Sequence, residues 1–124
     1  MARVWQTAGR LEDFPPASLT SRTVSGRTVI VANTPRGLYA IGPTCPHQGA
    51  SMAGAELCGT MVASEPGRYE YGCHLELVRC PWHRWEFHVE DGRAAFGTSA
   101  KRLVTYPLRV EGGEVQVSVP ARAR

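Results

Sequence analysis

The sequence lacks any long hydrophobic run. Its longest apolar stretches, such as Val29 to Ala32, are far too short to span a bilayer. The N-terminal segment from Met1 to Gln6 also lacks the apolar run of a signal peptide. We therefore expect a soluble protein with no membrane association, and the cytoplasm is its expected compartment.

Concentrated charge of one sign is also missing. The 14 Lys and Arg residues and the 11 Asp and Glu residues give a formal net charge of +3. The basic residues are dispersed along the chain, without a dense basic stripe or an interleaved aromatic platform. This pattern argues against nucleic-acid binding. A mild positive excess is compatible with an acidic protein partner.

Helical periodicity is weak throughout, whereas 13 Gly and 9 Pro in 124 residues predict frequent turns. Residues 27–32 and 38–41 form one predicted hairpin, 103–110 and 114–119 form another, and 84–89 form a further strand. The length fits one domain. The predicted fold class is therefore all-β, with a single domain over residues 1–124.

One region carries most of the residues that can bind a metal. Residues 42–82 contain all four cysteines and two of the four histidines, among Gly-Pro, Glu-Pro-Gly and Cys-Pro turns. We interpret this region as a long loop region. A structureless stretch of this length within a compact domain is usually functional.

Two short motifs stand out as ligand clips, which we define as Cys45-Pro46-His47-Gln48-Gly49 and Cys80-Pro81-Trp82-His83. Each clip offers one thiolate and one imidazole, and this combination suits zinc or an iron–sulfur cluster. Zinc-finger clips typically pair Cys with Cys and His with His. Mixed clips suit a dinuclear cluster in which one iron takes a cysteine from each clip and the other iron takes the histidines.

With these clips the chain resembles a Rieske-type ferredoxin. The resemblance runs from Val4-Trp5 to the closing segment Val115-Gln116-Val117, and it is strongest in the two clips and in Trp85-Glu86-Phe87. It implies a Rieske-like small antiparallel β-sandwich with a cluster-binding subdomain of two ligand loops. It also implies one [2Fe–2S] cluster per chain.

The resemblance further implies a role for each ligand. Cys45 and Cys80 would bind the inner iron, whereas His47 and His83 would bind the outer iron near the surface. Neutral imidazoles in place of two thiolates make the cluster less negative, so that an added electron is easier to accept.

The sequence differs from high-potential members of this family. Ala50 and Trp82 occupy the positions of two extra cysteines that form a disulfide in those proteins, and Trp85 and Phe87 stand where serine and tyrosine hydroxyls donate to sulfur. Loss of donors to sulfur destabilises the reduced state. We therefore predict a low-potential cluster of the oxygenase-associated type.

The spacing between the clips is about twice the usual one, because 32 residues separate His47 from Cys80. We therefore expect an insertion at about 57–78. Residues 58–76 of it are predicted to set partner choice. Cys58 and Cys73 within it are interpreted as free thiols rather than a disulfide, because disulfides are rare in a reducing compartment.

The predicted function is that of a soluble one-electron carrier, and not an enzyme. It would pass electrons from a flavin-dependent reductase to a terminal oxygenase through transient docking, as a monomer. One alternative is a non-catalytic Rieske-fold subunit of a larger oxidoreductase such as a nitrite reductase, and another is a zinc-stabilised interaction module. A Rieske oxygenase needs a mononuclear iron with two histidines and a carboxylate, and only His74 and His88 remain for it.

Overall fold

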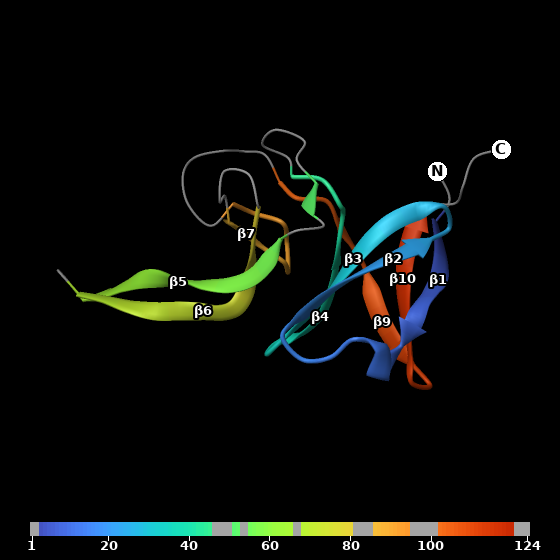
Figure 1. Ribbon diagram of the computed structural model, residues 1–124, viewed down its shortest axis with the longest axis horizontal. Coiled ribbons are helices and arrows are strands. Elements are labelled where there is room, and N and C mark those ends of the chain that lie inside the picture. Colours follow the sequence, from blue (N-terminus) through green and yellow to red (C-terminus); the bar gives the residue numbers. More distant parts are fainter. Residues whose placement is uncertain are drawn as a thin grey trace.

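The structure is a computed structural model that describes residues 3–45, 51–52, 55–65, 68–80, 86–94 and 102–120, with the backbone alone for 59–65 and 68–75. Within these ranges the chain forms ten strands and one short 3₁₀ helix (Figure 1). They are β1 (Arg3–Arg10), η1 (Leu11–Asp13), β2 (Ser18–Val24), β3 (Arg27–Thr34), β4 (Gly37–Ile41), β5 (Glu56–Glu65), β6 (Arg68–Arg79), β7 (Glu86–His88), β8 (Thr105–Tyr106), β9 (Leu108–Glu111) and β10 (Glu114–Pro120).

These strands form three antiparallel sheets. The first has the order β1-β10-β9, the middle sheet has the order β2-β3-β4-β8, and the third has the order β5-β6-β7. In Figure 1 the first two sheets lie together, and the β5–β6 hairpin projects away from them. The predicted all-β class is confirmed.

Strand β3 is buried on both faces, and this explains its unbroken apolar run. Val29 and Val31 face the first sheet, where they pack in buried clusters with valines of β10. Ile30 and Ala32 belong to a different buried cluster, which includes residues of the third sheet. A strand covered on both sides has no need of a polar face. The middle sheet therefore separates two cores.

The predicted hairpin at 27–41 is confirmed. The second predicted hairpin is confirmed only from Leu108, because Thr105–Tyr106 forms the separate strand β8, which pairs with β4 instead of β10. The turn of the second one contains Gly112 and Gly113, both with positive φ, which glycine adopts without steric cost. Of the strand predicted at 84–89, β7 covers Glu86–His88; Val89 already lies in the following turn, and residues 84 and 85 lie outside the described residues. The turn after β7 requires glycine at position 92, because a Cβ there would collide with the backbone carbonyl of Leu103.

The interpretation of residues 42–82 as a structureless loop is wrong. Strands β5 and β6 occupy most of this region and pair from Glu56↔Arg79 to Glu65↔Arg68. Register shifts between Cys58 and Thr60 and between Ala63 and Glu65 interrupt the ladder. Such bulges disturb the period-two side-chain pattern, so the polarity of the sequence does not alternate cleanly here.

No helix in the described ranges is long and apolar enough to cross a membrane.

Candidate metal centre

The first clip begins where the chain leaves the middle sheet. Thr44 and Ser51 pair as an isolated antiparallel bridge, and the Met52 amide donates to the Pro43 carbonyl at 2.7 Å. These contacts hold the two ends of the intervening segment together, as a tight ligand loop requires. Cys45 follows Thr44 directly and is only 1% exposed.

The second clip is closed in a similar way by the third sheet. Strands β6 and β7 pair through Val78↔Phe87 and Arg79↔Glu86, and the latter is the last pair before the clip. Cys80 follows Arg79 directly and is also 1% exposed.

The two cysteines lie in one buried cluster, although they come from different sheets. Its other members are Ile30, Ala32, Ile41, Met52, Val78, Phe87, Val89 and Leu103. Thiolates are costly in apolar surroundings unless a metal ion compensates their charge. Two buried cysteines that come from two clips and share one apolar cluster therefore fit the inner ligand pair of a metal cluster. This is the arrangement expected for Cys45 and Cys80.

The predicted histidine ligands, His47 and His83, lie outside the described residues, as do Trp82 and Trp85. Within the described residues, no group of three or more His, Cys, Asp and Glu side chains could hold a metal ion. The structure thus places two of the four predicted ligands together. The assignment of the complete set stays a prediction.

Phe87 is fully buried and belongs to the same cluster as both cysteines. The resemblance had placed it where related high-potential proteins carry a tyrosine whose hydroxyl donates to sulfur. Its burial in the cluster that also contains Cys80 and Cys45 is consistent with that placement. A phenyl ring excludes water from the cysteines but supplies no hydroxyl.

Beside the second clip lies a row of charged residues. Strand pairing places Glu56 on β5, Arg79 on β6 and Glu86 on β7 side by side across the third sheet. Arg79 binds Glu86 through Nη2 at 2.9 Å and Nε at 3.2 Å, and it binds Glu56 through Nη1 at 3.2 Å. The guanidinium therefore connects all three strands at the base of the clip.

Cys58 joins this row from β5. Its Sγ lies 3.6 Å from Oε2 of Glu86, and it is a free thiol, as predicted. Burial and then the Glu86 carboxylate raise the pKa of Cys58 to about 11. The thiol therefore stays protonated at neutral pH and donates to the carboxylate. The side chains of Cys73 and His74 lie outside the description.

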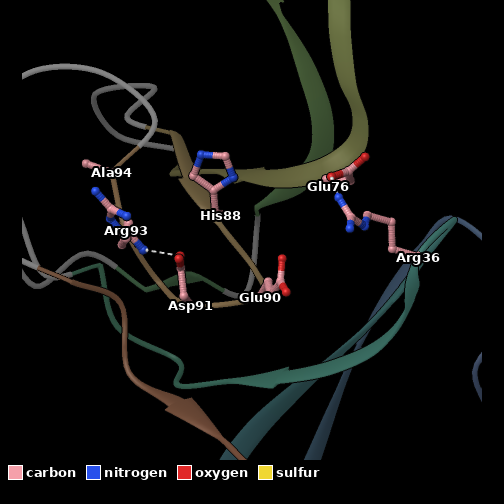
Figure 2. Close-up of a pocket in the computed structure, with 7 residues that line it drawn as sticks. All are labelled: Arg36, Glu76, His88, Glu90, Asp91, Arg93 and Ala94. Carbon is pink, nitrogen blue, oxygen red and sulfur yellow. Dashed lines mark hydrogen bonds and ion pairs between the residues drawn. The ribbon is translucent and has the colours of Figure 1, made fainter.

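A polar pocket of about 450 Å³ lies where the turn between β3 and β4 approaches β6, β7 and the turn after β7 (Figure 2). Its charged and polar lining residues are Arg36, Glu76, His88, Glu90, Asp91 and Arg93. Arg36, in the turn between β3 and β4, and Glu76 of β6 form an ion pair of 3.6 Å on one side of it. His88, expected to face solvent, is partly exposed on its wall. Neither Cys45 nor Cys80 lines this pocket.

Comparison with known proteins identifies the family. The Rieske [2Fe-2S] domain matches residues 4–107. The ferredoxin component of a naphthalene 1,2-dioxygenase system from Pseudomonas aeruginosa is 25% identical, over 96% of this chain and 99% of its own.

Two solved structures share the fold. The ferredoxin in a complex of reduced oxygenase and oxidised ferredoxin of carbazole 1,9a-dioxygenase superposes with a TM-score of 0.70, at 23% identity and with 92% of each chain covered. A putative NADH-dependent nitrite reductase small subunit from Mycobacterium tuberculosis gives a TM-score of 0.71 at 23% identity, covering 98% of this chain and 100% of that one.

The chain therefore belongs to the Rieske [2Fe-2S] domain family. Its cofactor is a single [2Fe–2S] cluster, and it is an electron-transfer protein rather than an enzyme in its own right. The predicted resemblance, fold and cofactor are confirmed. A zinc-stabilised interaction module does not fit this family.

The contribution of Arg79 and Glu86 was not predicted from the sequence. The dispersed arginines of the sequence include Arg79, whose side chain is only 25% exposed, and that of its partner Glu86 is only 13% exposed. The sequence did contain one indication of this ion pair, because the opposite charges of Arg79 and Glu86 lie immediately before and shortly after the second clip.

Proposed function

We propose that this protein carries single electrons from a flavin-dependent reductase to a terminal oxygenase, with Cys45 and Cys80 on the inner iron and His47 and His83 on the outer iron. The observation that carries the ligand assignment is the burial of both cysteines in one cluster, at the ends of two closed loops. When bound, the cluster supplies a reversible one-electron acceptor. The protein's own residues hold it, exclude water and present one end of it to a partner.

The naphthalene dioxygenase relative supports the role of an oxygenase partner, because its name makes it the ferredoxin component of such a system. The carbazole dioxygenase ferredoxin, which has the same fold, is found in a complex with its oxygenase. We further propose that docking is transient, that the carrier is monomeric and that it works in the cytoplasm. The free thiol of Cys58 is consistent with a reducing compartment.

The ligand assignment can be tested with four single variants. Cys45→Ser and His83→Cys should lose the Rieske absorption and the reduced-state EPR spectrum, whereas Cys58→Ser and Cys73→Ser should keep both. Cys58→Ser is the matched control, since it changes a partly buried cysteine of the same sheet. If Cys58→Ser bleached the protein, the assignment would be wrong.

The partner proposal needs a separate experiment. The purified protein is mixed with the reductase and the oxygenase of a naphthalene dioxygenase system, and product formation is measured with and without it. Product that depends on the protein supports the proposal. Failure with this and with other aromatic-ring dioxygenases, although the cluster is intact, would oppose it.

A second candidate function is a fixed, non-catalytic subunit of a larger reductase. It is favoured by the likeness to the putative nitrite reductase small subunit, which covers nearly the whole of both chains. Size-exclusion chromatography of native cell extract separates the two candidates. A diffusible carrier elutes at its own 13.5 kDa, whereas a fixed subunit elutes with its large partner.

A further inference from the structure

The charged row of Glu56, Arg79 and Glu86 lies at the point where the third sheet gives way to the second clip. Arg79 immediately precedes Cys80, and Glu86 is the first residue of β7. Their backbones are direct cross-strand partners. Antiparallel partners lie only about 5 Å apart. This pair therefore holds the two ends of residues 80–85 at a short, fixed separation.

Of the two ion pairs that Arg79 makes, the one with Glu86 is stronger than the one with Glu56. Two guanidinium nitrogens reach the same oxygen of Glu86, at 2.9 and 3.2 Å. The Glu86 side chain is 13% exposed, whereas that of Glu56 is 66% exposed. Solvent screens an exposed pair far more than a sheltered one. The loss of either partner would leave the other charge poorly compensated in a sheltered place.

The surroundings of Glu86 strengthen its position further. The Cys58 thiol reaches the same Oε2 atom from β5, at 3.6 Å. Glu86 thus accepts from two strands while its own backbone pairs with one of them. A carboxylate held from several sides has little freedom to move. The side chain is therefore suited to fixing the start of β7.

We propose that Arg79 and Glu86 form an ionic clamp that joins β6 to β7 beside the second clip and so positions Cys80 for the cluster. The two are positioning residues, because they act through the ligands and not on the cluster directly. The clamp rests on the ligand assignment proposed above. Its role is retention of the cluster: an open clip would let the ligands separate and release iron.

The test measures iron release from the loaded protein to a strong chelator, followed by loss of visible absorption. Arg79→Gln and Glu86→Gln should release iron about 10- to 100-fold faster, a range taken from the loss of metal affinity that follows when residues around metal ligands are changed. The exchanged pair Arg79→Glu with Glu86→Arg should recover most of the loss, since it restores the attraction across the same two strands.

Arg36→Gln is the matched control. Arg36 also forms an ion pair with β6, through Glu76 at 3.6 Å, but this pair lies away from the clip. Iron release from this variant should stay within about twofold of wild type. All rates are compared at a temperature at which far-UV circular dichroism shows every variant folded.

A second measurement separates a clamp from general stability. Loaded Arg79→Gln and Glu86→Gln should show broadened reduced-state EPR lines, because ligands that are less firmly held adopt a range of geometries. Arg36→Gln should keep the wild-type lines even if it lowers the melting temperature. General destabilisation would affect all three variants in proportion to the loss of stability.

The outcomes are distinct. Wild-type rates in Arg79→Gln and Glu86→Gln, or equal acceleration in Arg36→Gln, would overturn the clamp and leave the electron-carrier function standing. A wild-type protein without the [2Fe–2S] spectrum would overturn both. Faster release and broadened lines in the two clamp variants alone would support the clamp.

Discussion

At the residue scale, Phe87 offers a direct test of the predicted low potential. We expect a midpoint potential near the low end of the Rieske range, about −150 mV. Phe87→Tyr should raise it, because a hydroxyl in this buried cluster could donate to a sulfur and stabilise the reduced state. Redox titration measures the shift.

Phe14→Tyr is the control for this change. Phe14 is equally buried, but it packs with Val31 and Val115 in the cluster between the first two sheets. A new hydroxyl there should leave the potential unchanged. An unchanged potential in Phe87→Tyr would show that the residue does not occupy the tyrosine position of high-potential relatives.

Cys58 yields a prediction about pH. Its raised pKa of about 11 means that very little thiolate exists near pH 8, and only the thiolate is alkylated. In a Cys73→Ser background, the loaded protein should react with iodoacetamide at least about tenfold more slowly than free cysteine at pH 8. The rate should rise as pH increases toward 11.

The count of alkylated cysteines by mass spectrometry reports this reaction. The same protein in denaturant serves as the control, because there Cys58 regains an ordinary pKa. Rapid labelling of the folded protein at pH 8 would mean that the thiol is neither sheltered nor held by Glu86.

The cysteines proposed as ligands stand out in the sequence, whereas the residues proposed to support them do not. Cys45 and Cys80 each belong to a short motif that identifies them without knowledge of the fold. Arg79 and Glu86 acquire their role only through strand register, since their contact depends on β6 and β7 pairing at that one position. A one-residue shift would place them on opposite faces.

At the element scale, the β5–β6 hairpin is the feature that sequence described least well. The sequence predicts an insertion at about 57–78, but it predicts a loop where the structure has the two strands β5 and β6. Gly59 and Gly72 and two register shifts hide the alternation that reveals the C-terminal hairpin. Within the described part of the chain, no third strand pairs with the hairpin beyond Thr60↔Gly72, because β7 pairs with Leu77–Arg79.

Two-stranded ribbons without a supporting layer are marginally stable, so such an extension is expected to serve recognition. We predict that replacing residues 61–71 by a Gly-Ser turn leaves the cluster spectrum unchanged. Electron transfer to the native oxygenase should slow severalfold through weaker complex formation, while reduction of a small chemical oxidant should not. This deletion keeps Cys58 and the Arg79–Glu86 pair in place.

Stopped-flow kinetics at increasing oxygenase concentration separate binding from transfer. A raised half-saturation concentration with an unchanged limiting rate is the expected result. If the shortened protein lost iron or reacted with oxygen much faster, the hairpin would be a shield for the cluster rather than a docking element.

At the scale of the whole molecule, the two cores have different relations to the cofactor. The clusters between the first and middle sheets consist of residues such as Val29, Val31, Val115 and Val117, without a cysteine. The cluster between the middle and third sheets contains both Cys45 and Cys80. Metal binding contributes folding free energy where its ligands are. Iron removal should therefore affect one core and spare the other.

We predict that the iron-free protein keeps its two-sheet sandwich and loosens its third sheet. Amide hydrogen exchange should show protection falling by more than about tenfold in β5, β6 and β7, because local opening needs only the free energy of that unit. Protection in β1, β3 and β10 should stay within about threefold of the loaded protein, since their ladders and apolar contacts need no cofactor. Uniform loss of protection would instead mean that the molecule folds as one cooperative unit around the cluster. Unchanged protection in β6 would mean that the third sheet is stable without the metal. In that case the Arg79–Glu86 pair and the apolar cluster would be sufficient to stabilise it.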